Sequence, residues 1–136
     1  MMYIDTNAVI AYVDELDPNH DIANDLLKSL KGNKVVSKLT LVELASVYSR
    51  ASLNEPLALA LYSVKRVKAK IADVDFNEAL THALKLAPLL KLKTLDLLHV
   101  AICKAIGAKA FVTFDRDIVA KTNMMHKIGI EVVTKS

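Results

Sequence analysis

The sequence predicts an α/β domain, a three-layer α/β/α sandwich with a central parallel sheet. Short continuous apolar runs, typical of strands buried on both faces, alternate with segments in which apolar residues follow helical spacing. Because helical segments connect the strands, right-handed crossovers place helices on both faces of a parallel sheet. The chain has 136 residues and shows no repeat or linker, so residues 1–136 are predicted to form one domain.

The first half of the chain supplies two predicted strands, each followed by helical segments. Residues 2–4 form an apolar run that ends at Asp5, and residues 34–37 form a second run after Gly32. Apolar residues at helical spacing and suitable start residues predict the helices. These are residues 8–13, a segment from residue 19 or 20 to Gly32, one that Thr40 opens, and one from Pro56 toward residues 65–68.

The second half completes the alternation. Residues 71–74 are a weak strand candidate, and residues 76–90 show helical spacing that Pro88 is expected to bend or end. Residues 94–106 form the strongest predicted helix, and Gly107 suits the position just after its end. A strand at 110–113, a short helix at 117–124 and a strand at 130–133 follow.

Composition excludes several classes of protein. Apolar residues make up 53% of the chain and charged residues 24%, with three glycines and three prolines, which excludes disordered and collagen-like chains. A single cysteine, Cys103, excludes an intramolecular disulfide and a cysteine-based zinc cluster, so we expect a reduced, cytoplasmic protein. No apolar run approaches the roughly 18 residues that a membrane span needs, and the start lacks the basic region of a signal peptide.

Charge is distributed unevenly along the chain. Residues 1–27 carry six acids and no lysine or arginine, whereas the remainder carries 18 basic and nine acidic residues. This pattern fits a polyanionic partner gathered around an acidic spot, and it fits equally well an uneven solvated surface.

Five acids fall where predicted strands end and helices begin. Asp5 and Asp115 each follow a strand, with Asp117 two residues further on, and Glu43 and Asp96 each lie in the first turn of a helix. In a parallel sheet, strand ends and the helix starts that follow them share one edge, where ligand sites of open α/β sheets form. We therefore expect these carboxylates to converge on one spot.

Such convergence is unfavourable without a counterion. Two carboxylates about 4 Å apart repel by about 4 kcal/mol at an effective dielectric constant near 20. Helix N-termini offset about 0.3–1 kcal/mol each, and protonation or a bound cation would relieve the rest. An all-oxygen donor set favours Mg²⁺ or Mn²⁺ over zinc, and a divalent cation can activate water against a phosphodiester.

Each acid also has a purely structural interpretation. Thr40 and Glu43 match a capping box, in which Glu43 would only satisfy a backbone N–H. Asp96 is favourable in a first helical turn, and Asp115 and Asp117 suit a turn and an N-cap. Asp5 is harder to explain this way, because an acid that closes a short buried strand has few partners.

The four acid-bearing segments together resemble the motifs of PIN-domain ribonucleases, and in particular the VapC-like toxins of type II toxin–antitoxin pairs. Their order and spacing fit across nearly the whole chain. The segments are residues 3–7 (Tyr-Ile-Asp-Thr-Asn), Ser37 with residues 40–45 (Thr-Leu-Val-Glu-Leu-Ala), residues 95–101 (Leu-Asp-Leu-Leu-His-Val-Ala) and residues 112–117 (Val-Thr-Phe-Asp-Arg-Asp). One departure is Ile118, where many relatives carry phenylalanine, which changes packing and not ligand chemistry.

The resemblance implies a PIN-like α/β/α sandwich that binds Mg²⁺ or Mn²⁺ and hydrolyses RNA. It also implies a homodimer and an antitoxin protein that fills the acidic groove. Carried over by residue, the catalytic, metal-binding acids are Asp5, Glu43, Asp96 and Asp115. Asp117 would be an accessory metal ligand, and hydrogen bonds from Thr6, Asn7 and Thr113 would support the site.

Other candidates have two interpretations each. Arg116 would contact the RNA strand or form a salt bridge that relieves the crowding of acids. The basic residues between Lys65 and Lys70 would contact phosphates or end a solvated helix. His99 would act as a general acid or, the favoured interpretation, be a packed histidine bonded to a partner.

Two alternatives to a nuclease remain at this stage. One is a non-catalytic PIN-like module that binds RNA or protein through the same acids. The other is a receiver-type phosphoryl-transfer domain, whose phosphoacceptor would be Asp73 or Asp75 after a strand of doubtful quality.

Overall fold

The computed structural model describes residues 1–135 and contains a five-stranded parallel sheet in the order β3-β2-β1-β4-β5. The strands are β1 (Met2–Ile4), β2 (Lys34–Val36), β3 (Ala69–Ile71), β4 (Ala110–Val112) and β5 (Glu131–Val133). The helices are α1 (Thr6–Val13), α2 (His20–Ser29), α3 (Lys38–Arg50), α4 (Pro56–Arg66), α5 (Phe76–Leu90), α6 (Thr94–Ala105), α7 (Arg116–Val119) and α8 (Thr122–Lys127). The predicted α/β class and parallel sheet are confirmed.

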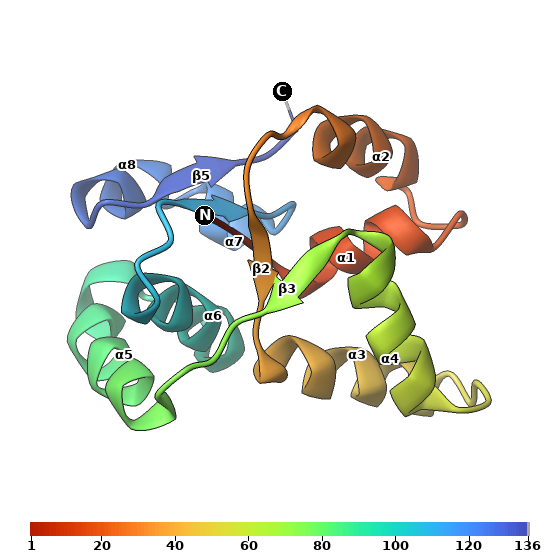
Figure 1. Ribbon diagram of the computed structural model, residues 1–136. Coiled ribbons are helices and arrows are strands. Elements are labelled where there is room, and N and C mark those ends of the chain that lie inside the picture. Colours follow the sequence, from red (N-terminus) through yellow and green to blue (C-terminus); the bar gives the residue numbers. More distant parts are fainter. Residues whose placement is uncertain (136) are drawn as a thin grey trace.

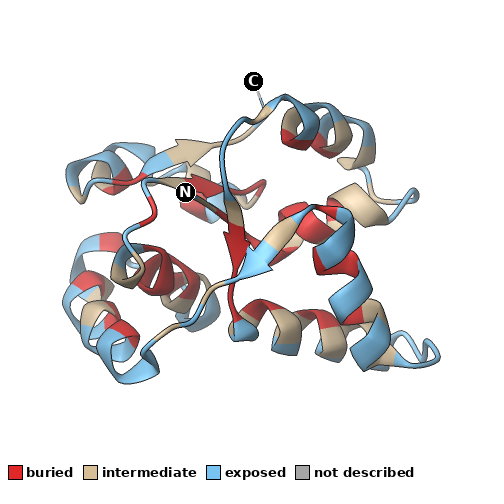
Figure 2. Cartoon of the chain, in the orientation of Figure 1, coloured by how far each residue is buried: buried red, intermediate tan, exposed pale blue. Residues whose placement is uncertain are grey.

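Side chains that alternate along the strands divide the core into two layers. Tyr3 and Phe111 point toward one face, where they pack with residues of α5, α6 and α8. Ile4 and Val112 point toward the other face and pack with residues of α1 to α4. Figure 1 shows the two groups of helices on opposite sides of the sheet, and Figure 2 shows that buried residues line the strands and the inner sides of the helices.

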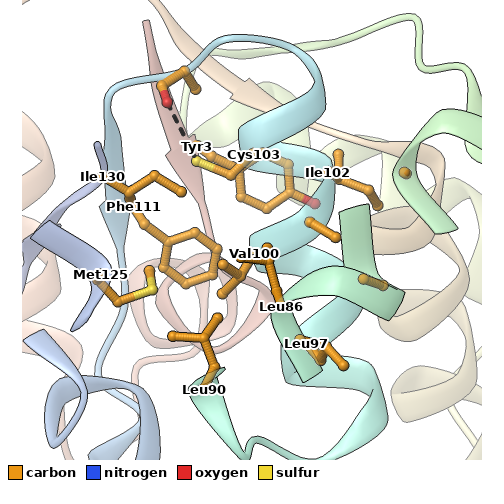
Figure 3. Packing of buried hydrophobic residues seen from close by; sticks show 14 of the residues in the cluster. Tyr3, Leu86, Leu90, Leu97, Val100, Ile102, Cys103, Phe111, Met125 and Ile130 are labelled. Carbon is orange, nitrogen blue, oxygen red and sulfur yellow. Dashed lines mark hydrogen bonds between the residues drawn. The ribbon is translucent and has the colours of Figure 1, made fainter. Parts of the chain in front are cut away.

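Aromatic stacking reinforces the layer around α6. The Tyr3 and Phe111 rings, from neighbouring strands β1 and β4, are stacked with centroids 5.6 Å apart and planes inclined by 14°. Val100, Leu90 and Met125 surround them in the same cluster (Figure 3). This packing fixes β1 laterally, just before the chain reaches Asp5.

The strand order reverses beside β1, which creates the crevice where ligands bind in open α/β sheets. From β1 the chain moves outward to β2 and β3, then returns to the other side of β1 for β4 and β5. The boundary between β1 and β4 is therefore the topological switch point. The β1–β4 ladder continues to Asp5, whose backbone N–H donates to the Val112 carbonyl at 2.9 Å, so Asp5 lies at the carboxyl edge.

Several predicted boundaries were wrong. Ser37 is the N-cap of α3, so the strand ends at Val36 and Thr40 lies inside the helix. The third strand covers Ala69–Ile71, because it pairs with β2 from Lys34 to Val36 at a largely exposed edge where apolar patterning is weak.

Two helical segments also differ from the prediction. The α5 helix continues through Pro88 to Leu90, since a proline in the last turn removes a single backbone bond near a helix end. The predicted helix at 117–124 is two short helices, α7 and α8.

Within residues 1–135, no helix combines the length and the apolar character that crossing a membrane requires.

Truncation of the α3 core residue Leu44 should destabilise the fold. Leu44 is fully buried among α1, α3 and α4, so Leu44→Ala should lower the free energy of unfolding by about 2–5 kcal/mol. Val42 on the same helix is 64% exposed, and Val42→Ala should change it by less than about 0.5 kcal/mol. Urea unfolding checks both values, and equal losses in the two variants would contradict this packing.

Candidate metal centre

Asp5 is buried at the end of β1 and is held by three hydrogen bonds. Its side chain is the N-cap of α1, because Oδ1 accepts from the Thr6 backbone N–H at 2.9 Å. Its Oδ2 accepts from Asn7 Nδ2 at 3.1 Å and from Thr113 Oγ1 at 2.8 Å. Asp5 is only 3% exposed. Its donors come from the segments that follow β1 and β4, so the carboxylate is held in one orientation.

Asn7 and Thr113 join the loops that follow β1 and β4. Asn7 Nδ2 donates to Thr113 Oγ1 at 3.2 Å, and Asn7 Oδ1 accepts from the Phe114 backbone N–H at 3.0 Å. Thr113 Oγ1 also accepts from the Asp115 backbone N–H at 3.0 Å. The side chains therefore set the position of Asp115 relative to Asp5.

Asp96, Asp115 and Asp117 bring one carboxylate oxygen each to within 4.8 Å of one another. Asp96 lies in the first turn of α6, and Asp117 lies in the first turn of α7. Asp115 is the N-cap of α7 and accepts from the Asp117 backbone N–H at 2.8 Å, so of the two aspartates expected to form a turn and an N-cap, Asp115 is the cap. Three carboxylates on two helix N-termini are an oxygen donor set that suits Mg²⁺ or Mn²⁺.

Asp5 and Glu43 lie outside this group of three, but their charges reach it. Burial raises the pKa of Asp96 to about 6, and repulsion by Asp115, Asp5 and Glu43 adds to the rise. Burial likewise raises the pKa of Asp5, against the opposing effects of His99 and Thr113. The raised pKa values of Asp96 and Asp5 indicate that negative charge is unfavourable at these two positions, and a nearby cation would stabilise it.

Glu43 is bonded to side chains of α1 and α6. Its Oε1 accepts from Thr6 Oγ1 at 2.8 Å and from His99 Nε2. Burial by itself raises the pKa of Glu43, but the hydrogen bond and charge of His99 outweigh burial and leave it below its usual value. The capping-box interpretation of Glu43 was wrong, because the α3 box is formed by Ser37 and Thr40.

His99 is packed and bonded to partners, as the favoured interpretation expected. It is 1% exposed on α6, with Nε2 against Glu43 and Nδ1 2.7 Å from the Tyr3 hydroxyl. Sequence reasoning did not single out Tyr3 as part of the site. The sequence did contain a signal for Tyr3, which lies in the predicted buried strand that ends just before Asp5. A buried tyrosine hydroxyl needs a hydrogen-bond partner, and that partner was to be expected near the site.

The basic candidates lie in two different places. Arg116 is exposed at the start of α7, and no carboxylate within 4.0 Å pairs with it in residues 1–135, so the salt-bridge interpretation is wrong. Arg66 and Lys68 line a pocket of about 170 Å³ together with Lys28 and Lys34. Since Lys34 begins β2, this pocket lies at the amino edge of the sheet, opposite the carboxylates.

The fold and site define a class: α/β/α domains that collect acidic side chains at the switch point of a parallel sheet. A family comparison is consistent with that class, since the PIN domain model matches residues 2–123. The chain belongs to the PIN domain family. No curated protein matches its sequence.

Solved structures with the same fold include VapC proteins. VapC20 of Mycobacterium tuberculosis, a toxin that cleaves the sarcin-ricin loop, has a TM-score of 0.71 at 18% identity, over 88% of this chain and 94% of that one. VapBC2 of Rickettsia felis, bound to a DNA fragment from its promoter, gives 0.70 at 17% identity over the whole of both chains. A toxin–antitoxin complex of Klebsiella pneumoniae gives 0.65 at 17% identity, over 87% and 90%. The fold of this protein is therefore that of VapC toxins.

Removing the charge of Asp96 should stabilise the metal-free protein. The folded-state pKa near 6 exceeds the ordinary value of 3.8, so the folded state holds more protons between these values and loses stability as pH rises through them. In EDTA, Asp96→Asn should melt above the wild type at about pH 7.5, and the difference should shrink toward about pH 4.

The control for this comparison is Asp25→Asn, which changes an exposed acid of α2. This control should follow the wild type across the same pH range. An Asp96→Asn variant that melts below the wild type at every pH would contradict the crowding of carboxylates.

Proposed function

We propose that the protein is a Mg²⁺- or Mn²⁺-dependent endoribonuclease and the toxin of a VapBC-type toxin–antitoxin pair. The observation that carries this proposal is the cluster of Asp96, Asp115 and Asp117 at the carboxyl edge, beside Asp5 at the switch point. Membership of the PIN domain family and the fold of VapC toxins support the same function.

Asp96, Asp115 and Asp117 would hold the cation, and Asp5 and Glu43 would complete the acidic set. When bound, a divalent cation supplies positive charge that polarises a phosphoryl oxygen and acidifies the attacking water. The hydrogen bonds to Asp5 keep its carboxylate oriented without a rearrangement at the moment of reaction. Thr6, Asn7 and Thr113 thus support the site as preorganised hydrogen-bond donors to its carboxylates.

Arg116 would bind the RNA backbone next to the acids. It stands between Asp115 and Asp117 in sequence, it is exposed, and no carboxylate of residues 1–135 pairs with its guanidinium. A contact to a phosphate gives affinity and position without sequence choice. The basic pocket lined by Arg66 and Lys68 lies at the amino edge of the sheet, opposite the carboxylates, so we do not assign it to RNA binding at this site.

An antitoxin protein and a second copy of this chain are the proposed partners. The neighbour from Klebsiella pneumoniae is a toxin–antitoxin complex, which supports the first partner. Exposed leucines on α4 and α5 supply apolar surface for protein contacts, among them Leu57 at 71% and Leu84 at 77%.

Cleavage should depend on the metal and on Asp96. Purified protein should cut an RNA mixture in Mn²⁺ and not in EDTA, and Asp96→Asn should reduce cleavage in Mn²⁺ to the EDTA level, because a metal ligand is lost. Asp25→Asn is the matched control and should cut like the wild type. Wild-type cleavage by Asp96→Asn would contradict the proposal.

Metal binding is measured separately from cleavage by melting temperature. A ligand at about 100 times its Kd stabilises a protein by about 2.7 kcal/mol, so Mn²⁺ should raise the wild-type melting temperature and leave Asp96→Asn unchanged. A Mn²⁺ shift without cleavage of any RNA would favour the non-catalytic binding module instead.

A further inference from the structure

We propose that Tyr3 and His99 are positioning residues that hold Glu43 beside the aspartate cluster with a single oxygen free. The proposal rests on the proposed metal-dependent function. It is carried by a continuous chain of side-chain contacts, buried except at Glu43, from β1 through α6 to α3.

The chain of contacts begins in the core. Tyr3 is fully buried, stacked on Phe111, and its hydroxyl lies 2.8 Å from Ser37 Oγ and 2.7 Å from His99 Nδ1. Neither partner is more than 1% exposed. Thr40 Oγ1 lies 3.4 Å from the same hydroxyl, which therefore has no access to water and is fixed by the sheet and by three polar neighbours.

The directions of the hydrogen bonds follow from the chemistry of each group. An ionised carboxylate can only accept hydrogen bonds, so the His99 Nε2–H group donates a hydrogen bond to Glu43 Oε1. When the imidazole is neutral, a proton on Nε2 leaves Nδ1 as an acceptor, and the Tyr3 hydroxyl then donates to it. Ser37 Oγ then donates to the Tyr3 oxygen, and the network assigns His99 to the Nε2–H tautomer.

This network uses one oxygen of Glu43 and leaves the other free. Oε1 accepts from both His99 Nε2 and Thr6 Oγ1, while Oε2 has no hydrogen-bond partner in the described part of the chain. The Glu43 side chain is about a quarter exposed, at 25%. Because Oε1 already accepts two hydrogen bonds, Glu43 cannot bind a cation through both oxygens. It offers only Oε2 to a cation held by the aspartate cluster.

His99 and Asp96 are linked through their helix. They are three residues apart in α6, so one rigid turn carries both the aspartate of the cluster and the residue that holds Glu43. Loss of His99 would free the long Glu43 side chain to sample several rotamers and would leave the buried Tyr3 hydroxyl with fewer partners. Because partners behind metal ligands orient them, that loss should weaken the metal centre.

Three substitutions separate positioning from mere packing. His99→Leu removes both hydrogen bonds of the imidazole, whereas Tyr3→Phe leaves the bond to Glu43 and removes the hydroxyl that contacts His99, Ser37 and Thr40. His99→Gln keeps a donor for Glu43 and an acceptor for Tyr3. His126→Leu, which changes an exposed histidine of α8, is the matched control.

The first measurement is the Mn²⁺ concentration that gives the half-maximal rise in melting temperature. We expect His99→Leu to need about 10- to 100-fold more Mn²⁺, Tyr3→Phe to shift in the same direction, and His99→Gln to recover most of the loss. The control should match the wild type. In RNA cleavage at saturating Mn²⁺, kcat should fall in His99→Leu while KM for RNA stays unchanged.

A purely structural role gives a different result. If His99→Leu or Tyr3→Phe melts earlier without metal but keeps the wild-type Mn²⁺ concentration and kcat, the proposal is overturned. If His99→Gln is as impaired as His99→Leu, the proposal is also overturned. Should His99→Leu fail to fold, Tyr3→Phe and His99→Gln still decide between the two roles.

A measurement on the wild-type protein tests the network directly. Nitrogen-15 NMR of labelled histidines should show the Nε2–H tautomer for neutral His99 without metal, and a neutral Nδ1–H tautomer would overturn the assignment. The proposed function fails separately: a wild type that shows no Mn²⁺ shift overturns both proposals. A wild-type shift that the His99 and Tyr3 variants retain overturns the positioning role alone.

Discussion

Repulsion between carboxylates at one edge of the sheet is the constraint on which the arrangement depends. Parallel strands carry Asp5 and Asp115 to the same edge, and α6 adds Asp96 beside them. A structure selected for stability alone would separate these charges, yet burial and mutual repulsion raise the pKa of Asp96 to about 6. A divalent cation bound at this edge would stabilise the ionised carboxylates.

Hydrogen bonds rather than ion pairs make this crowding tolerable. Thr6, Asn7 and Thr113 surround Asp5 with donors, and Asp115 and Asp117 both lie at the N-terminus of α7. In residues 1–135, two carboxylates lie within 4.0 Å of a basic side chain, both of them beside histidines, and only the contact between Glu43 and His99 lies at this edge. The hydroxyl, amide and backbone donors around Asp5 carry no charge, so they orient its carboxylate and preserve its attraction for a metal.

Particular residues show where sequence reasoning succeeded and where it failed. The switch-point edge could be predicted because Asp5 and Asp115 directly follow buried strands, and strand direction does not depend on side-chain detail. The capping box was misplaced by three residues because Ser37 and Thr40 are both good caps, and only the end of β2 selects Ser37. The third strand was misplaced because an exposed edge strand lacks the apolar pattern that marks its neighbours.

The sequence by itself determined the α/β class, the parallel sheet and the candidate acids, because each depends on local period and on position relative to strand ends. Only the tertiary structure decided which acids group together. It placed Asp96, Asp115 and Asp117 within one shared space and turned Glu43 toward His99 and Thr6. Those choices depend on side-chain directions across four segments distant in sequence, and no local pattern encodes the distance between them.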